Sequence, residues 1–370
     1  MVDSKQQWKA WLFLLPAIVL LLIFTVWPII NTVRIAFLVN YSPLEAQTGA
    51  TFPFGFTNFV TVLKYGQSGN FFDGVVATLN GNGGQAGLIG CLTNTIILTL
   101  LTVPISCFLA LLISVFLNSI PKFSKVFQTI YFLPYVTNSI AIGMVFAMMF
   151  NIVGLQNVPV ATYNGNLEIY NITTRLVEVT QMVNGEPTKV LVEEQWGQVA
   201  QSWGIINNVI QFFGGQPTNW INAGSEYWPN IAVLTIYIVW NALPFKILIL
   251  LGGLQSVNKQ YYDAAKIDGA SKVTVFGRIT VPLLSPMIAY VVITSFIGGF
   301  KEYSSIVGIF NETMGPAGQS NRLNTMVGYI YSAMDTDNYG TASAAAIILF
   351  IVILLITLLN LYVSNKKVHY

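Results

Sequence analysis

Six apolar runs, each long enough to cross a lipid bilayer, set the fold class of this chain. They extend over residues 11–37, 88–117, 126–150, 229–251, 283–310 and 342–363. A helix needs about 20 mostly apolar residues to span the hydrocarbon core. Of the 370 residues 54% are hydrophobic and only 9% are charged, whereas about 25% are charged in soluble domains. The sequence therefore predicts an all-α polytopic membrane protein with six transmembrane helices.

The basic residues predict how these helices are oriented, because Lys and Arg in short connections accumulate on the cytoplasmic side. With the N-terminus inside, the cytoplasmic segments hold Lys5, Lys9, Lys122, Lys125, Lys259, Lys266, Lys272, Arg278, Lys366 and Lys367. The opposite side receives Lys64, Arg175, Lys189 and Arg322. The first run is too long for the core of a signal peptide, so we expect it to remain as a helix. The sequence thus predicts a multi-pass protein of the cell membrane with both termini in the cytoplasm.

The connections predict the domain organisation. Gly and Asn crowd residues 66–87, which predicts irregular chain. Apolar and polar residues alternate along 171–183 and again along 188–194, on either side of Asn184-Gly185. This pattern predicts a β-hairpin. The predicted order is the N-terminus and first helix (1–37), an extracellular loop (38–87), the second and third helices (88–150), a small β-rich extracellular insert (151–228), the fourth and fifth helices with a cytoplasmic loop at 252–282 (229–310), and a last extracellular loop, the sixth helix and a cytoplasmic C-terminus (311–370).

Residue types that metal, cofactor and nucleic-acid sites need are scarce. The chain has one His and two Cys, and on one helix Cys91 and Cys107 would lie about 24 Å apart, beyond disulfide reach. A net charge of +2 without a basic run disfavours nucleic acid as a partner. The sequence contains no G-x-x-x-x-G-K-[ST] phosphate loop. We expect no metal and no cofactor, and any use of ATP would require a separate ATPase.

Residues 252–282 predict a structured cytoplasmic loop. Asn258 can cap a helix over 259–267, Gly269 can end it, and Ser271 can cap a second helix that ends before Pro282. Small side chains at Ala264, Ala265, Gly269 and Ala270 would let another protein approach the backbone, beside the exposed anions Asp263 and Asp268. From these residues alone, an amphipathic helix pair that anchors the loop on the membrane surface is equally compatible.

The same loop resembles a known family motif. It resembles the "EAA" loop of permease subunits of binding-protein-dependent ABC importers. The residues that carry this resemblance are Asp263-Ala264-Ala265, then Gly269 and residues 279–282. The segments DAAKIDGAS and FGRITVPLLSP are similar to the carbohydrate class, typified by the larger permease subunit of the maltose transporter. The similarity extends along most of the chain, through LFLLPAIVLLLIFTVWPII, GFTNF, LTNT, GIIN, NW and GGLQSV.

The resemblance implies a non-catalytic transport subunit of the type I importer fold, which imports an oligosaccharide with ATP hydrolysed by a partner. Its implied partners are a second homologous permease, two ATP-binding subunits and an extracellular solute-binding protein. The loop would form a coupling helix that docks on the ATPase through Asp263, Ala264, Ala265, Asp268, Gly269 and Ala270. Asp263 stands where the family usually has Glu. The side chain is one methylene shorter, so a salt bridge from this position to a basic residue of the ATPase is in question.

In the family, sugar contacts come from the two helices that flank this loop. The matching segments here are 237–245 and 294–303, and they offer Trp240, Asn241, Ser295, Phe300, Lys301, Glu302 and Tyr303. Ordinary helix packing is the competing explanation for the aromatic residues. Lys301 and Glu302 lie in the outer half of the fifth helix if it continues through 304–310, and at the headgroups if it ends near Phe300. Lys246 is expected to snorkel toward the cytoplasm.

Two questions stay open from the sequence. A self-contained carrier driven by an ion gradient is the rival function, but such carriers show inverted repeats, and this chain shows no clear repeat. A receptor without transport would leave the structured loop without a role unless it bound a signalling partner. We expect the extra residues between Asn151 and Gly204 to contact the solute-binding protein, with a simple spacer as the alternative.

Overall fold

The computed structural model describes residues 7–64, 71–82, 87–120, 129, 137–162, 169–183 and 186–367. Its α-helices are α1 (Gln7–Leu21), α2 (Trp27–Ala36), α3 (Pro43–Gln47), α4 (Thr57–Lys64), α5 (Phe71–Ala77), α6 (Gly87–Ser119), α8 (Ser139–Phe150), α9 (Ile205–Phe212), α10 (Tyr227–Ser256), α11 (Lys259–Ile267), α12 (Lys272–Val275), α13 (Val281–Leu283), α14 (Ser285–Phe300), α15 (Ser304–Phe310), α16 (Met326–Asp335) and α17 (Tyr339–Lys367). Shorter or wider helical turns are η2 (Leu22–Val26), η3 (Thr78–Asn82), η5 (Val160–Thr162), η6 (Phe276–Thr280) and η7 (Asn311–Thr313).

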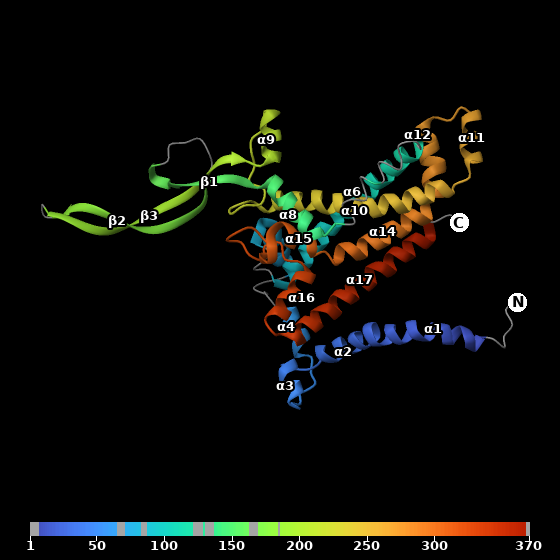
Figure 1. The fold of residues 1–370 in the computed structure, drawn as a ribbon, viewed down its shortest axis with the longest axis horizontal. Helices are drawn as coiled ribbons and strands as arrows, with labels where there is room; N and C mark the ends of the chain where they lie inside the picture. Colours follow the sequence, from blue (N-terminus) through green and yellow to red (C-terminus); the bar gives the residue numbers. More distant parts are fainter. Residues whose placement is uncertain are drawn as a thin grey trace.

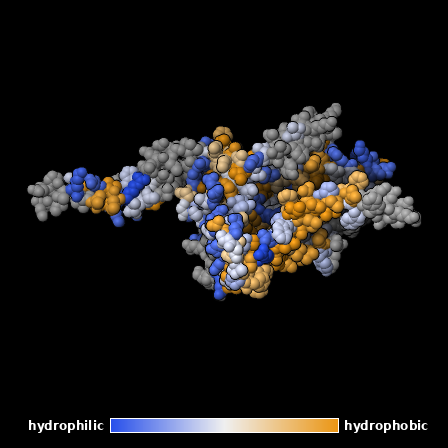
Figure 2. Space-filling model, turned by 60° about the horizontal axis from the view of Figure 1, so that its bottom comes forward, coloured by the Kyte–Doolittle hydropathy of each residue, from blue (hydrophilic) through white to orange (hydrophobic). Residues whose placement is uncertain are grey.

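Four of the described helices are long and apolar enough to cross a membrane: Trp11–Ala36, Gly87–Ser119, Tyr227–Ser256 and Tyr339–Ser364. Lys272–Leu283 and Ser285–Phe300 form a pair that is bent by 69° and would be a fifth span. Figure 1 shows α6 and α10 side by side, with α14 between them and α17. Figure 2 shows a broad apolar surface over the helical part of the molecule. The fold is that of a multi-pass membrane protein.

The predicted number of six spans stays a prediction. From the third predicted run, α8 covers Ser139–Phe150, and most of the remainder lies outside the described residues. The fifth run does not form one helix, because α14 ends at Phe300 and α15 begins at Ser304. The Glu302 carboxylate accepts a hydrogen bond from the backbone N–H of Ser305 (3.1 Å) and so starts a new helix. The irregular chain expected at 66–87 is wrong for the described residues 71–77, which form α5, while η3 after them contains Gly81 with a non-helical φ of +86°.

Hydroxyl groups in the apolar helix α6 are satisfied within the helix itself. Thr95, Thr99, Thr102 and Ser106 each donate to the backbone carbonyl four residues earlier, at 2.5 to 2.7 Å. An unpaired hydroxyl inside a membrane would cost several kcal/mol. These bonds remove that cost and leave the hydroxyl oxygen lone pairs available to other groups.

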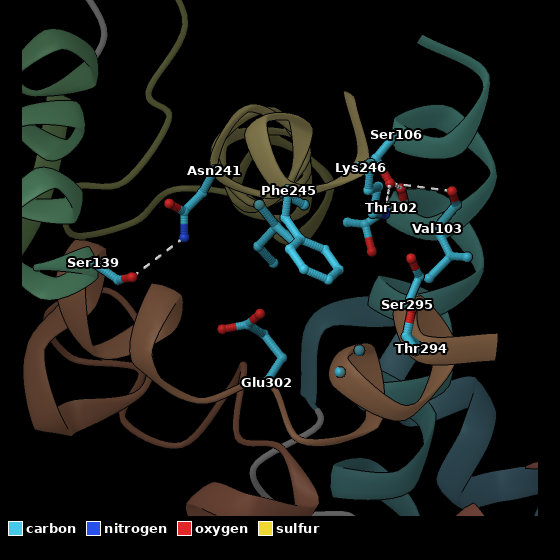
Figure 3. Close-up of a pocket in the computed structure, with 14 residues that line it drawn as sticks. Thr102, Val103, Ser106, Ser139, Asn241, Phe245, Lys246, Thr294, Ser295 and Glu302 are labelled. Carbon is cyan, nitrogen blue, oxygen red and sulfur yellow. Dashed lines mark hydrogen bonds between the residues drawn. The ribbon is translucent and has the colours of Figure 1, made fainter. Parts of the chain in front are cut away.

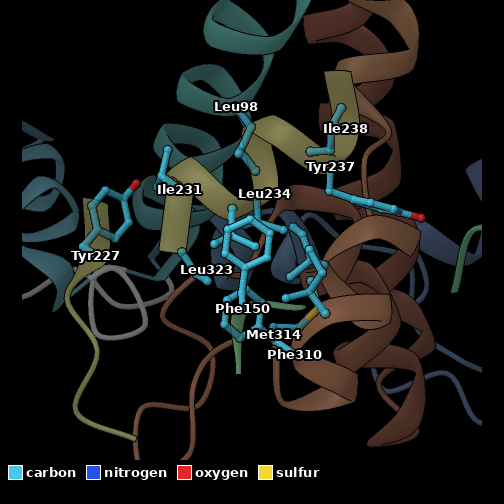
Figure 4. Close-up of a cluster of buried hydrophobic side chains, with 13 residues drawn as sticks. Leu98, Phe150, Tyr227, Ile231, Leu234, Tyr237, Ile238, Phe310, Met314 and Leu323 are labelled. Atoms are coloured by element: carbon cyan, nitrogen blue, oxygen red, sulfur yellow. The ribbon is translucent and has the colours of Figure 1, made fainter. Parts of the chain in front are cut away.

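Buried apolar clusters hold the helices together. One cluster joins α6, α8, α10 and α15 through Leu98, Phe150, Leu234 and Ile306 (Figure 4). Close backbone contact supports it, since a Cβ on Gly143 would lie 2.7 Å from the Gly308 Cα atom. Only glycine at these two positions allows α8 and α15 to approach so closely.

The segment after α8 forms a three-stranded antiparallel sheet in the order β1-β3-β2, with β1 (Ile152–Pro159), β2 (Ile169–Val183) and β3 (Glu186–Trp203). Val183 pairs with Glu186, while the predicted turn at Asn184-Gly185 lies outside the described residues. The Arg175 guanidinium carbon lies 5.8 Å from the ring centre of Trp196. Figure 1 shows this sheet at one end of the helical bundle and α11 at the other, where α1 begins and α17 ends. That the sheet is an extracellular insert stays a prediction.

Candidate functional site

A cavity of about 430 Å³ lies between α6, α10 and α14 (Figure 3). It is lined by Thr102, Val103, Ser106, Ser139, Ile238, Asn241, Ala242, Phe245, Lys246, Thr294, Ser295, Gly298, Gly299 and Glu302. The lining combines hydroxyl, amide and charged groups with a few apolar surfaces. Such a lining offers hydrogen bonds in several directions, which suits a ligand that carries many hydroxyl groups.

Lys246 supplies the cation of this cavity. Its side chain is only 6% exposed, and its Nζ donates a hydrogen bond to the Ser106 Oγ atom. Ser106 in turn donates to the Thr102 carbonyl (2.5 Å). Within the described part of the chain, no carboxylate lies at ion-pair distance from Lys246. The expectation that Lys246 snorkels toward the cytoplasm is therefore wrong, because the side chain turns inward to α6.

Glu302 supplies the anion, at the break between α14 and α15. One carboxylate oxygen accepts hydrogen bonds from the backbone N–H groups of Tyr303 (3.2 Å) and Ser305 (3.1 Å). The Glu302 carbonyl accepts from the Thr325 hydroxyl (2.9 Å), which ties the break to the chain before α16. Figure 3 shows the carboxylate directed into the cavity, facing Asn241 and Phe245. The Glu302 side chain is half-buried, and charges within membrane helices are costly and typical of functional positions.

Two further predicted residues complete the cavity. The Asn241 amide donates to the Ser139 Oγ atom of α8 (3.3 Å), which leaves the Asn241 carbonyl oxygen free of any hydrogen bond within the described residues. The Ser295 hydroxyl donates to the Val291 carbonyl (2.5 Å) on its own helix. Asn241, Ser295 and Glu302 thus come together from two helices and the break that follows.

The other four predicted substrate residues do not line the cavity. The Trp240 ring packs against Phe146, with ring centres 5.1 Å apart. Phe300 is 4% exposed and belongs to an apolar cluster with residues of α2, α16 and α17. Lys301 is exposed, and Tyr303 stacks on Tyr331 with ring centres 4.4 Å apart. Whether any predicted residue contacts a ligand remains a prediction.

A buried polar network closes the bundle on the sheet side of the cavity. Arg322 is 8% exposed and donates to the Ser225 carbonyl (2.6 Å) and to the Gln319 side chain. Asn94 donates to the Arg322 carbonyl (3.1 Å) and accepts from the Tyr227 hydroxyl (2.8 Å). Burial lowers the pKa of Arg322 from its usual value. The network fixes the segment before α16 against the start of α10.

The predicted coupling loop is a separate surface at the far end of α10. Asn258 caps α11 by accepting from the Gln260 N–H (3.0 Å), and Gly269 ends it with a φ of +69°. Ser271 caps α12 as expected, although the helical chain then continues past Pro282 to Leu283. A second cavity of about 330 Å³ lies here, and its lining includes Ala264, Ala265, Asp268 and Ala270.

The surface around α11 exposes apolar and charged side chains together. Ile267 and Val273 are 87% and 80% exposed, although both are apolar. Asp263 pairs with Lys266 at 3.7 Å, with both side chains largely exposed. Polar residues gather at this end of the molecule in Figure 2. Exposed apolar side chains with a polar rim favour contact with another protein.

Comparison with known proteins agrees with this architecture. The family "Binding-protein-dependent transport system inner membrane component" matches residues 103–369. The chain is 28% identical over 278 residues to the arabinooligosaccharides transport system permease protein AraP of Bacillus subtilis (strain 168), covering 74% of this chain and 71% of that protein. It is 25% identical over 367 residues to the lactose transport system permease protein LacF of Rhizobium radiobacter, covering 97% and 95%.

A solved structure shows the same fold. It is the crystal structure of a bacterial alginate ABC transporter in complex with an alginate pentasaccharide-bound periplasmic protein. One of its chains superimposes with a TM-score of 0.64 at 21% identity, over 100% of this chain and 98% of that chain. The family match covers well over half of the residues, and the chain therefore belongs to the binding-protein-dependent transport system inner membrane components.

Proposed function

We propose that this chain is the membrane-spanning permease subunit of an ATP-driven importer of oligosaccharides and has no catalytic activity of its own. The family match and the relatives named as sugar transport permeases support this proposal. A partner hydrolyses the ATP, since the sequence contains no phosphate loop. The importer works by alternating access, in which the cavity opens to one side of the membrane at a time.

One observation carries the proposal: the cavity and the α11 loop are connected by the same two helices. α10 holds Asn241 and Lys246 in its middle and leads directly into α11. The loop returns through α12 and α13 to α14, which holds Ser295. A displacement of the α11 loop is therefore transmitted along α10 and α14 to opposite walls of the cavity.

The proposed complex contains a second homologous permease, two ATP-binding subunits and an extracellular solute-binding protein. The ATP-binding subunits contact α11 through Asp263, Ala264, Ala265, Asp268, Gly269 and Ala270. The third predicted run completes six transmembrane helices of the type I importer fold, and both termini lie in the cytoplasm of the cell. In this orientation the sheet faces the solute-binding protein.

The proposed substrate path passes Asn241, Ser295 and Glu302, and Lys246 and Ser106 line the same cavity. The path supplies donors and acceptors to sugar hydroxyls from several directions. Trp240, Phe300 and Tyr303 pack outside the cavity and Lys301 is exposed, so none of these four residues belongs to the path in this conformation.

Transport by the reconstituted complex tests this function. The chain is co-expressed with the partner genes of its host, purified, and placed in liposomes with the binding protein and radiolabelled oligosaccharides. Uptake that requires ATP, and that stops with a hydrolysis-deficient ATP-binding subunit, supports the proposal. Uptake driven by an ion gradient without ATP contradicts it and favours a secondary carrier.

The role of the sheet has its own test. The Gly204 N–H donates to the Asn151 carbonyl (3.0 Å), so residues 152–203 can be removed and the two ends joined without moving the bundle. Complex assembly is expected to persist, while stimulation of ATP hydrolysis by the binding protein is lost. Unchanged stimulation would reduce the sheet to a spacer.

A further inference from the structure

The helix α9 exposes an apolar stripe that the proposed function does not use. Ile205, Val209, Phe212 and Phe213 are 60%, 49%, 84% and 81% exposed. The spacing of the first three places them on one face of the helix, and Phe213 follows directly as its C-cap residue. The polar residues Asn207 and Gln211 lie on a different face. Water contact with such a stripe is unfavourable, so it needs an apolar partner.

The opposite side of α9 is held firmly against the bundle. The Asn207 side chain is 1% exposed, donates to the Thr218 carbonyl (2.9 Å) and accepts from the Thr218 N–H (3.1 Å). It also accepts from the Trp220 indole N–H (2.9 Å). Trp220 packs on Phe150, the last residue of α8, with ring centres 5.7 Å apart. The exposure of the stripe is therefore fixed by the fold, because the helix cannot rotate without breaking these bonds.

The position of α9 matches the boundary of a membrane. Gly204, directly before α9, bonds to Asn151, directly after α8, and a Cβ on Gly204 would lie 2.6 Å from the Asn151 carbonyl oxygen. Thr218 and Trp220 lie a few residues before α10, the spanning helix that begins at Tyr227. Figure 1 shows α9 lying across the direction of α10, at the end of the bundle that bears the sheet. Its axis thus runs along the bilayer surface when α10 crosses the bilayer.

The composition of this segment favours lipid over a protein partner. Residues 204–225 contain no charged side chain, so the segment has no charge with which to pair a specific protein surface. Phe212 and Phe213 form an edge-to-face pair with ring centres 5.3 Å apart, which gives the end of the stripe a compact aromatic surface. Aromatic and aliphatic residues on one face of a helix are typical of helices at the boundary between headgroups and acyl chains.

We propose that α9 is an interfacial helix that inserts Ile205, Val209, Phe212 and Phe213 into the bilayer at the sheet end of the bundle. Its partner is the lipid surface. Because β3 ends at Trp203, one residue before Gly204, the inserted helix also fixes the base of the sheet at the membrane. The inference rests on the membrane fold and is independent of which cargo is transported.

Depth-dependent quenching in the full-length chain tests this proposal. In a background with Cys91→Ala and Cys107→Ser, Phe213→Cys and Gln211→Cys are labelled with a small fluorophore. Each is placed in nanodiscs together with the co-purified partner subunits. The quenchers are phosphatidylcholine spin-labelled near the headgroup end of its acyl chain, and aqueous iodide. Val209→Cys is a second stripe position, in case the loss of Phe213 disturbs the helix.

We expect the lipid quencher to act several-fold more strongly at positions 213 and 209 than at position 211, and iodide to show the opposite order. Strong iodide quenching at 213 and 209 without lipid quenching would overturn the proposal, because the stripe would face water. Shielding of both stripe positions from both quenchers would also overturn it and would assign the stripe to a protein interface. Loss of sugar uptake with the lipid quenching intact would affect only the proposed function.

Discussion

The central cavity and the α11 loop both carry charged residues, but they satisfy those charges differently. In the cavity, Lys246 bonds to a serine hydroxyl and Glu302 accepts backbone amides, and neither faces an opposite charge at ion-pair distance within the described residues. In the loop, Lys266 and Asp263 pair with each other while their side chains are 79% and 68% exposed. Water screens the loop pair, whereas the cavity charges are held in place by the fold.

This difference indicates two kinds of function. Fixed, partly satisfied polar groups in a cavity bind a small ligand without first losing much conformational freedom. The proposed docking of a partner on the α11 loop instead relies on small side chains that let two backbones approach each other closely. Substitutions in the loop should therefore affect coupling without affecting stability. Substitutions in the cavity should affect substrate binding, and should lower stability only where they leave a polar group without its partner.

The largest effect is expected at Gly269. A Cβ at this position meets nothing within 4 Å, but its φ of +69° disfavours most side chains. Gly269→Asn keeps this backbone conformation, because Asn tolerates positive φ, and adds only bulk. If a partner approaches the loop closely, ATP-driven uptake falls by about a hundredfold, as for a central interface residue. The measurement is uptake, with thermal unfolding as a check of the fold.

Gly277→Ala is the matched control for Gly269→Asn. Gly277 lies on the same loop, has a helical backbone and has open space at its Cβ position. The Gly277→Ala variant should therefore support uptake at the normal rate. Normal uptake by Gly269→Asn would remove the argument that the loop is a docking surface.

The next largest effect is expected at Glu302. Glu302→Gln retains an oxygen that can accept from Tyr303 and Ser305 but removes the negative charge. The loss of one charged hydrogen bond to substrate should raise the KM for uptake about tenfold with little change in stability. Glu302→Ala leaves two donors without an acceptor and should cost about 1–3 kcal/mol of stability.

The neighbouring Lys301→Gln is the control for Glu302, since Lys301 is exposed and does not line the cavity that Glu302 lines. It should change neither KM nor stability. An unchanged KM in Glu302→Gln would show that the carboxylate serves only to start α15.

A smaller effect is expected at Lys246. Lys246→Met keeps the apolar stem and removes a buried cation, so stability should not fall. The affinity for substrate, measured through uptake, should fall about fivefold, which corresponds to the loss of one ordinary hydrogen bond. Ser106→Ala instead leaves the cation without its acceptor and should destabilise the protein more than Lys246→Met does. The opposite order of stability would mean that Lys246 finds another acceptor.

The comparison also explains which parts of the molecule were predictable. The α11 loop depends on local signals, namely the caps Asn258 and Ser271 and the positive φ of Gly269, and each is encoded within a few residues. The strands around residues 171–194 were visible as alternation for the same reason. The sequence does not decide whether the helix breaks at residues 301–303, because the break depends on how the Glu302 carboxylate bonds to the start of α15.

The cavity depends on which face of each apolar helix turns inward, and uniform apolar composition hides this. The sequence favours snorkelling for Lys246 and does not reveal its contact, because Ser106 is 140 residues away in the chain. One signal was available: Thr95, Thr99, Thr102 and Ser106 recur at helical spacing along α6, and all four are buried. The packing of Trp240 and Phe300 away from the cavity has no comparable signal, since aromatic residues suit both a core and a sugar site.

The smallest effect is expected at the exposed pair in α11. Asp263→Asn removes the contact with Lys266, which is worth at most about 0.5 kcal/mol at such exposure, so thermal unfolding should barely change. If docking depends on close approach at Ala264, Ala265 and Gly269, stimulated ATP hydrolysis should fall only about twofold, an effect in the range of a rim charge. If Asp263→Asn instead reduced ATP hydrolysis as strongly as Gly269→Asn reduces uptake, most of the docking energy would come from the Asp263 carboxylate and not from close approach of the backbones. The α11 loop would then resemble the cavity, in that a charged side chain would contribute directly to recognition.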